Sequence, residues 1–140
     1  MPTNGEGDGG AQTILIVDDQ DSFRRIMGRT LRRRGFEIAE ASSGDAALSA
    51  LAEMNRAVDL AVIDIVMPGM NGFALAERIS RLYAGCKILF ISGYPFATLE
   101  RDYGMAAHLL PVFLPKPFGT EAFIAKVNEL LGGGMTRGPL

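Results

Sequence analysis

The sequence has little that would suit an oxidising compartment or a membrane. Its single cysteine, Cys86, can form no disulfide within the chain, and we expect a buried, unreactive thiol there. No apolar run comes near the roughly 20 residues that a membrane-spanning helix needs. The first residues also lack the basic and apolar regions of a secretory signal. We therefore expect a cytoplasmic protein that does not contact a membrane.

A surplus of charge is also missing. The 14 basic and 16 acidic residues give a formal net charge of −2, so the chain as a whole offers no electrostatic reason to bind nucleic acid. Basic residues crowd only one segment, with arginines at positions 24, 25, 29, 32, 33 and 34. Because no aromatic residues alternate with them, we interpret these arginines as the solvated face of a helix rather than a nucleic-acid site.

The chain is long enough for one packed domain and too short for two. Of its 140 residues, 48% are hydrophobic, which is enough for a single core. Residues 1–12 and 132–140 are rich in glycine, and we expect them to be flexible tails. The domain should therefore occupy residues 13–131.

Within this range, short apolar runs alternate with segments of helical period. These patterns predict strands at residues 13–17, 36–40, 60–63, 87–91 and 112–114, and helices at 22–34, 44–54, 73–82 and 120–131. Asp21 or Ser22 is expected to cap the first helix. Between the fourth and fifth strands, Gly104 and Pro111 interrupt any long helix, so only a short, weakly held helix is expected.

Strands that alternate with helices predict a parallel sheet with helices on both faces. The uninterrupted apolar strands agree, since strands covered on both sides are apolar throughout. In such α/β sheets the functional crevice lies beyond the carboxyl ends of the strands. The residues that follow each strand are therefore the candidates for a functional site.

Those positions hold three acids, one hydroxyl and one amine. In chain order they are Asp18 and Asp19 after the first strand, Asp64 after the third, Ser92 after the fourth and Lys116 after the fifth. Three carboxylates in one crevice raise each other's pKa unless a cation lies among them. Mg²⁺ suits such a site, because it prefers a few carboxylates together with water and phosphate oxygens.

An aspartate can itself attack phosphorus, because it is ionised at neutral pH and needs no general base. Phosphoryl transfer then requires neutralisation of the phosphoryl oxygens, which Mg²⁺, Lys116 and Ser92 could each provide. Singly, these residues are equally typical of helix caps, turns and surface charge. Together, at the ends of four strands, they favour phosphorylation of Asp64.

Four segments in this frame match a known family. They are Ile-Val-Asp-Asp at 16–19, Asp-Ile-Val-Met-Pro-Gly-Met-Asn-Gly at 64–72, Phe-Ile-Ser-Gly-Tyr at 90–94 and Leu-Pro-Lys-Pro-Phe at 114–118. As a set, over about residues 13–131, they resemble the receiver domain of two-component response regulators. The residues of these motifs are most similar to those in receivers of hybrid histidine kinases and in single-domain receivers. The resemblance implies a flavodoxin-like (βα)5 doubly wound parallel sheet with strand order 2-1-3-4-5.

The resemblance also implies roles for the strand-end residues. Asp64 would be the phosphoacceptor, and Asp18, Asp19, Asp64 and the backbone carbonyl of Val66 would hold Mg²⁺. Asp19 would bind the metal directly and Asp18 mostly through water. Ser92 would move toward the phosphoryl group and Lys116 would pair with it, with the Lys116–Pro117 peptide bond in the cis form.

The resemblance implies that three further positions govern the conformational change on phosphorylation and the lifetime of the phosphoryl group. Phe113 falls where the family has an aromatic switch residue, although it is also typical of a plain core phenylalanine and lacks the hydroxyl of a tyrosine. Val66 and Tyr94 fall at positions that tune the lifetime of the phosphoryl group. Because one is apolar and the other bulky, they could obstruct the attacking water, and we predict slow autodephosphorylation.

By the same resemblance, the partners would be a histidine kinase or histidine phosphotransfer protein and a downstream protein target. Gln20, Phe23 and Ile26 are the candidates for docking the histidine-bearing partner. We expect a signalling phosphoacceptor rather than an enzyme, as a monomer or weak homodimer. His108 is not expected to carry a phosphoryl group, because no acid lies near it in the sequence.

Two alternatives remain open from the sequence. A metal-dependent phosphatase could form an aspartyl-phosphate during turnover, but the haloacid dehalogenase-like enzymes need a second acid two residues after the nucleophile, where Val66 stands. A pseudo-receiver would bind partners without phosphate. Such domains typically lose an acid or the lysine, and this chain has all of them.

Overall fold

The computed structural model describes residues 10–132. In chain order the elements are β1 (Thr13–Val17), α1 (Asp21–Arg32), β2 (Glu37–Ala41), α2 (Gly44–Glu53), β3 (Leu60–Asp64), α3 (Gly72–Leu82), β4 (Lys87–Ser92), α4 (Phe96–Tyr103), the 3-10 helix η1 (Ala107–Val112), β5 (Phe113–Pro115) and α5 (Thr120–Leu131). The predicted tails, 1–12 and 132–140, lie for the most part outside the described residues.

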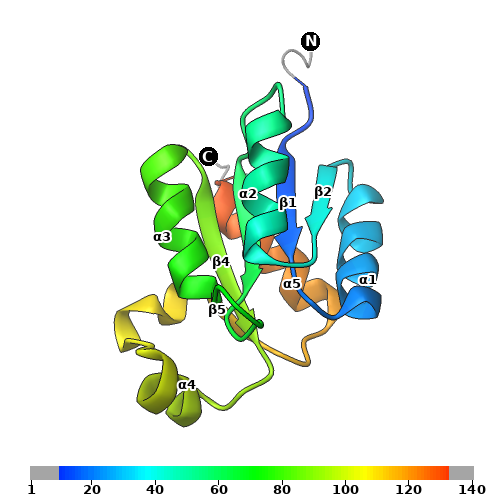
Figure 1. Ribbon diagram of the computed structural model, residues 1–140. Helices are drawn as coiled ribbons and strands as arrows, with labels where there is room; N and C mark the ends of the chain where they lie inside the picture. The colour runs from blue at the N-terminus through cyan, green and yellow to red at the C-terminus, as the bar shows by residue number, and fades with distance from the viewer. Residues whose placement is uncertain (1–9, 133–140) are drawn as a thin grey trace.

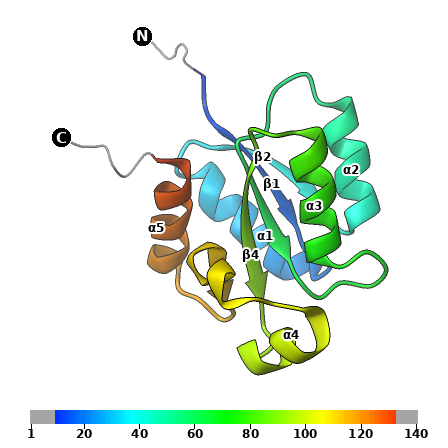
Figure 2. The same cartoon turned by 90° about the vertical axis from the view of Figure 1, so that its left-hand side faces the viewer.

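The strands form one parallel sheet in the order β2-β1-β3-β4-β5, which confirms the predicted topology. Helices α1 and α5 cover one face of this sheet, and α2 and α3 cover the other (Figures 1 and 2). Successive side chains of β1 point to opposite faces, so Ile14 packs under α1 and α5 whereas Leu15 packs under α2 and α3. Among the helices of residues 10–132, none is long and apolar enough to span a bilayer.

The first helix and the strand after it differ from the predicted boundaries. Helix α1 begins at Asp21 and its N-cap is Gln20, whose side chain makes no capping hydrogen bond. The predicted cap was wrong because the Asp21 carboxylate pairs with Arg24 at 2.7 Å instead. The helix ends at Arg32, and Gly35, with a φ of 94°, turns the chain toward β2. Strand β2 therefore begins one residue later than predicted.

Arg24 corrects the interpretation of the arginines as a wholly solvated face. Its position on α1 directs it inward with Met27 and Leu31, and it is only 9% exposed. The guanidinium donates to the backbone carbonyl of Asp18 at 2.8 Å and to the Glu40 carboxylate at 3.2 Å. Arg24 therefore ties α1 to the ends of β1 and β2.

The segment between β4 and β5 holds two short helices. Helix α4 lies beyond the carboxyl ends of the strands, at the bottom of both views (Figures 1 and 2), and buries only Leu99. This agrees with the prediction of a weakly held helix. The 3-10 helix η1, which includes Pro111, was not predicted, and it delays β5 to Phe113–Pro115.

Cys86 is buried, as predicted, with 8% of its surface exposed. Burial, with a smaller contribution from the charge of Asp59, raises the pKa of the thiol to about 11. Because the thiolate is the nucleophile, we expect no alkylation of the folded protein by iodoacetamide at about pH 8 and complete alkylation after denaturation. Mass spectrometry measures this directly, and rapid labelling of the native protein would contradict the buried position.

Candidate functional site

The predicted site residues converge at the carboxyl edge of the sheet. Asp64 and Ser92 are the last residues of β3 and β4, whereas the sequence placed them just after these strands. The sheet extends further because Asp64 pairs in register with Ile91, and Ser92 with Pro115. Both side chains are consequently buried, Asp64 being 5% exposed and Ser92 fully inaccessible.

Asp18, Asp19 and Asp64 form a compact group of carboxylates. One oxygen from each lies within 4.8 Å of the others. Asp18 is fully buried and its Oδ1 accepts a hydrogen bond from the Gln20 N–H at 2.9 Å, whereas Asp19 is exposed to solvent. The group therefore has a fixed inner side and an open outer side.

Lys116 supplies the positive charge among these acids. Its Nζ lies 3.0 Å from Asp18 Oδ2 and 3.3 Å from Asp64 Oδ2. It also donates to Gln20 Oε1 at 3.0 Å and lies 4.4 Å from the centroid of the Phe23 ring. Its backbone N–H donates to the Ser92 carbonyl at 2.8 Å, which anchors the loop after β5 to the end of β4. The Lys116–Pro117 peptide bond is cis, as expected.

The contacts of Gln20 and Phe23 with Lys116 could not have been anticipated from the sequence. Gln20 and Lys116 are 96 positions apart, and no spacing pattern relates them. Phe23 also meets the ring of Phe118 edge-on at 5.5 Å, so it is partly engaged within the domain. Of the three predicted docking residues, Ile26 is the most freely presented apolar group, with 57% of its surface exposed.

The electrostatics of the site raise the pKa of Asp64 to about 6. Burial is the largest cause, and the charge of Asp18 adds to it. The Lys116 ammonium and the Val66 N–H, which donates to Asp64 Oδ1 at 3.3 Å, act in the opposite direction. A single ammonium thus compensates the buried carboxylates only in part.

A cavity of about 560 Å³ opens above Asp64. Its lining residues are Asp19, Gln20, Asp64, Val66, Met67, Pro68, Gly93, Tyr94 and Lys116. Asp18 and Ser92 lie behind this surface, and Ser92 Oγ accepts a hydrogen bond from the Tyr94 N–H at 3.0 Å. Phe113 lies in the core, 8% exposed, and His108 is exposed on η1.

The residues present fit a small divalent cation. In octahedral coordination at about 2.1 Å, ligand oxygens lie roughly 3 to 4 Å apart, which is close to the grouping of the three carboxylates. Three carboxylates and one ammonium leave a formal charge of −2 when all are ionised, and a divalent ion neutralises it. Burial and, to a lesser extent, the charge of Asp18 raise the pKa of Asp64, and a cation beside it would favour the ionised carboxylate.

An acid-lined cavity at the carboxyl edge of a 2-1-3-4-5 sheet defines the class of the protein as a CheY-like α/β domain. A family model described as the response regulator receiver domain matches residues 14–128. The chain belongs to this family and is a receiver domain of two-component signalling.

Individual relatives agree with this assignment. The chain is 36% identical over 122 residues to the sensor kinase CckA of Brucella abortus, a match that covers 87% of this chain and 13% of the kinase. It is 29% identical over 118 residues to the response regulator receiver protein CpdR of the same organism, covering 84% and 95% of the two chains. Two further curated relatives are matched over 31% and 48% of their length, so the chain spans less than half of several relatives.

Solved structures share the fold. The response regulator TrrA of Thermotoga maritima, crystallised in complex with Mg²⁺ and BeF, superimposes with a TM-score of 0.71 at 28% identity. The match covers 85% of this chain and 98% of TrrA.

Proposed function

We propose that Asp64 accepts a phosphoryl group from a phosphohistidine of a kinase or phosphotransfer protein. In this step a carboxylate oxygen of Asp64 attacks phosphorus, an O–P bond forms, and the N–P bond breaks with its electron pair passing to the imidazole. No general base is needed, because the attacking group carries no proton when it is ionised. The observation that supports the proposal best is the Lys116 ammonium, held between Asp18 and Asp64 beneath an open cavity.

The site also suits a metal-assisted reaction. Asp18, Asp19, Asp64 and the Val66 carbonyl would hold Mg²⁺, which supplies positive charge to the carboxylates and to the phosphoryl oxygens. Lys116, whose Nζ lies 3.3 Å from Asp64 Oδ2, would pair with a phosphoryl oxygen. Ser92 would give up the N–H of Tyr94 and turn its hydroxyl toward the same group.

Phosphorylation would then change a surface that binds a downstream protein. It adds a charge of about −1.5 to −2 at the end of β3. The nearby helix α4 is poorly anchored, since Leu99 is its one buried residue. A movement of Ser92, with a change in the packing of Phe113, would let the α4 region settle in a second arrangement.

Labelling with a small phosphodonor tests this function. Wild type, Asp64→Asn and Asp102→Asn are incubated with acetyl phosphate and Mg²⁺, and intact masses are recorded. Asp102 is a matched control, because it is an exposed aspartate whose ion pair is with its neighbour Arg101. We expect a stable gain of one phosphoryl group by wild type and by the control, and none by Asp64→Asn.

The other outcomes point to the two alternative functions. Rapid release of inorganic phosphate, with no stable adduct, would favour a metal-dependent phosphatase. At the position where such an enzyme needs a second acid, however, Val66 offers only its N–H to Asp64. Absence of both labelling and turnover would favour a phosphate-independent binding module.

We further predict that the aspartyl-phosphate is long-lived. Val66 and Tyr94 both line the cavity, and the Tyr94 ring meets Tyr103 of α4 edge-on at 6.3 Å. Both side chains restrict the approach of water to the phosphorus. The half-life in Mg²⁺ should be minutes or longer, and Tyr94→Ala should shorten it several-fold. A wild-type half-life of seconds would contradict the prediction.

A further inference from the structure

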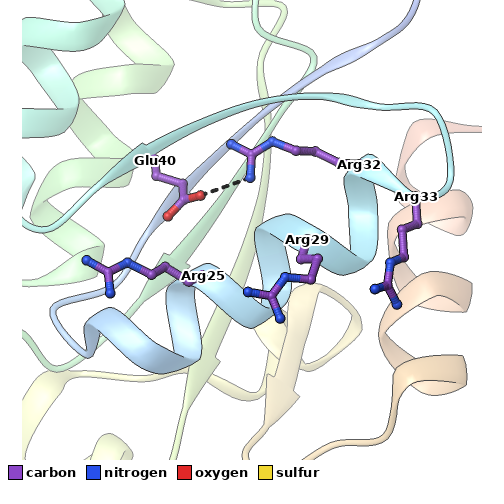
Figure 3. A pocket seen from close by; sticks show the side chains of 5 residues that line it. All are labelled: Arg25, Arg29, Arg32, Arg33 and Glu40. Atoms are coloured by element: carbon purple, nitrogen blue, oxygen red, sulfur yellow. Dashed lines mark ion pairs between the residues drawn. The ribbon is translucent and has the colours of Figure 1, made fainter.

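Helix α1 presents a row of four arginines, Arg25, Arg29, Arg32 and Arg33, which we call the arginine stripe. They are separated by four, three and one positions, the first three lying on α1 and Arg33 at its C-cap, and all four are exposed. They line a cavity of about 430 Å³ together with Glu40 of β2 (Figure 3). The stripe is separate from the cavity above Asp64, with which it has no lining residue in common.

The charges of the stripe are mostly uncompensated. Glu40 is shared between Arg32, at 3.3 Å, and the inward-facing Arg24, at 3.2 Å. Within residues 10–132, Arg25, Arg29 and Arg33 form no ion pair within 4.0 Å, and Figure 3 shows their side chains reaching outward from the helix.

Such a row is unfavourable for the isolated helix. Like charges four residues apart, as in Arg25 and Arg29 or Arg29 and Arg33, repel each other. The remainder of the chain is acidic enough to bring the net charge to −2, so the positive charge is concentrated rather than general. The stripe is therefore better suited to an anionic partner than to an unoccupied surface.

We propose that the arginine stripe binds an acidic helix of a protein partner. Arg25, Arg29 and Arg33 follow one another at about 6 Å along α1, the same interval that separates carboxylates four residues apart on a second helix. Guanidinium groups form paired hydrogen bonds with carboxylates, and every member of the stripe is arginine rather than lysine. Glu40 fixes Arg32 at the base of the stripe, which orients that group before the partner arrives.

The dimensions of the stripe disfavour nucleic acid. The stripe extends about 12 Å along the helix. The phosphate backbone of a nucleic acid is longer than this, so it would extend past the stripe and lie against the acidic remainder of the protein. A single helix with three or four carboxylates on one side matches the stripe without extending past it. The proposal goes beyond the phosphorylation of Asp64 and does not depend on it.

A synthetic peptide tests the proposal. The probe is a fluorescent helical peptide with glutamates at every fourth position, and its control has the same composition with the glutamates distributed around the helix. Binding to the full chain is measured by fluorescence anisotropy at low and at moderate salt. We expect wild type to prefer the patterned peptide, with an affinity that falls as salt rises.

Two triple variants make the test specific. Arg25→Gln/Arg29→Gln/Arg33→Gln should weaken binding by about tenfold or more, which corresponds to about 1.4 kcal/mol. Arg78→Gln/Arg81→Gln/Arg101→Gln removes three exposed arginines from other helices and should bind like wild type. Circular dichroism and acetyl phosphate labelling report whether each variant is folded.

Three outcomes would overturn the proposal. The first is equal weakening in both variants, which would indicate a response to net charge alone. The second is equal binding of the two peptides. The third is the absence of peptide binding at low salt. Binding of an oligonucleotide or of anionic vesicles to the stripe in its place would also contradict a helical protein partner.

Discussion

Replacement of Lys116 by methionine is expected to destabilise the domain by about 2–4 kcal/mol in magnesium-free buffer near neutral pH. The ammonium of Lys116 lies within 3.3 Å of two buried carboxylates, those of Asp18 and Asp64. Methionine retains the packing of the side chain but leaves these carboxylates without a cation. A buried charge that loses its partner costs more than the pair contributed, because neither water nor a counter-charge replaces it.

The loss of stability caused by Lys116→Met should depend on pH and on Mg²⁺. Lys116 lowers the pKa of Asp64, so its removal raises that pKa above about 6. The native state then holds a proton that the unfolded state releases, and the stability of the variant falls as the pH rises toward this pKa. The difference from wild type should be smaller at about pH 5, where Asp64 is protonated in both proteins, than above neutrality. Mg²⁺ should reduce it, because the ion replaces the missing positive charge.

Chemical denaturation of both proteins, with and without EDTA, measures these effects. Lys87→Met is the control, since Lys87 is an exposed lysine at the start of β4, at the opposite edge of the sheet. It should unfold like wild type under every condition. A Lys116→Met protein as stable as wild type in EDTA would mean that the ammonium does not stabilise the two carboxylates.

The alternation of parallel strands with helices was predictable because it depends on short-range patterns, whereas the strand order was implied by the family resemblance. Residues 60–63, Leu-Ala-Val-Ile, form an unbroken apolar run, which is typical of a strand covered on both faces. Once the strands are parallel and alternate with helices, their carboxyl ends share one edge, so Asp18, Asp64 and Lys116 were expected at the same edge of the sheet.

Other features depend on contacts between distant segments. The hydrogen bond from Lys116 to Gln20 requires the packed structure, since no local pattern relates the two residues. Arg24 shares the inward face of α1 with Met27 and Leu31, but its bonds to Asp18 and Glu40 likewise require the packed structure. The 3-10 helix η1 was missed because Pro111 is typical of a break in an α-helix but is compatible with a short 3-10 turn. The one-residue extension of β3 to Asp64 likewise depends on its pairing with β4.

Asp64→Asn is expected to stabilise the domain in magnesium-free buffer, by about 1–3 kcal/mol above pH 6. Burial raises the pKa of Asp64 from 3.8 in an unfolded chain to about 6. Between these values the native state binds a proton that the unfolded state has released, so the stability of wild type falls as the pH rises from about 4 to about 6. Asparagine keeps the size and the acceptor of the side chain without this ionisation, and its advantage should therefore vanish near pH 4.

The comparison of unfolding free energies across this pH range checks the prediction, and added Mg²⁺ sharpens it. Mg²⁺ should stabilise wild type more than Asp64→Asn, because it binds the ionised Asp64 carboxylate, which the variant lacks. The stability of wild type should therefore approach or exceed that of the variant. Asp102→Asn, at an exposed site, should change neither the pH dependence nor the response to Mg²⁺. An Asp64→Asn protein less stable than wild type in EDTA would mean that the ionised carboxylate stabilises the fold. Burial would then not destabilise the ionised form of Asp64, contrary to its raised pKa.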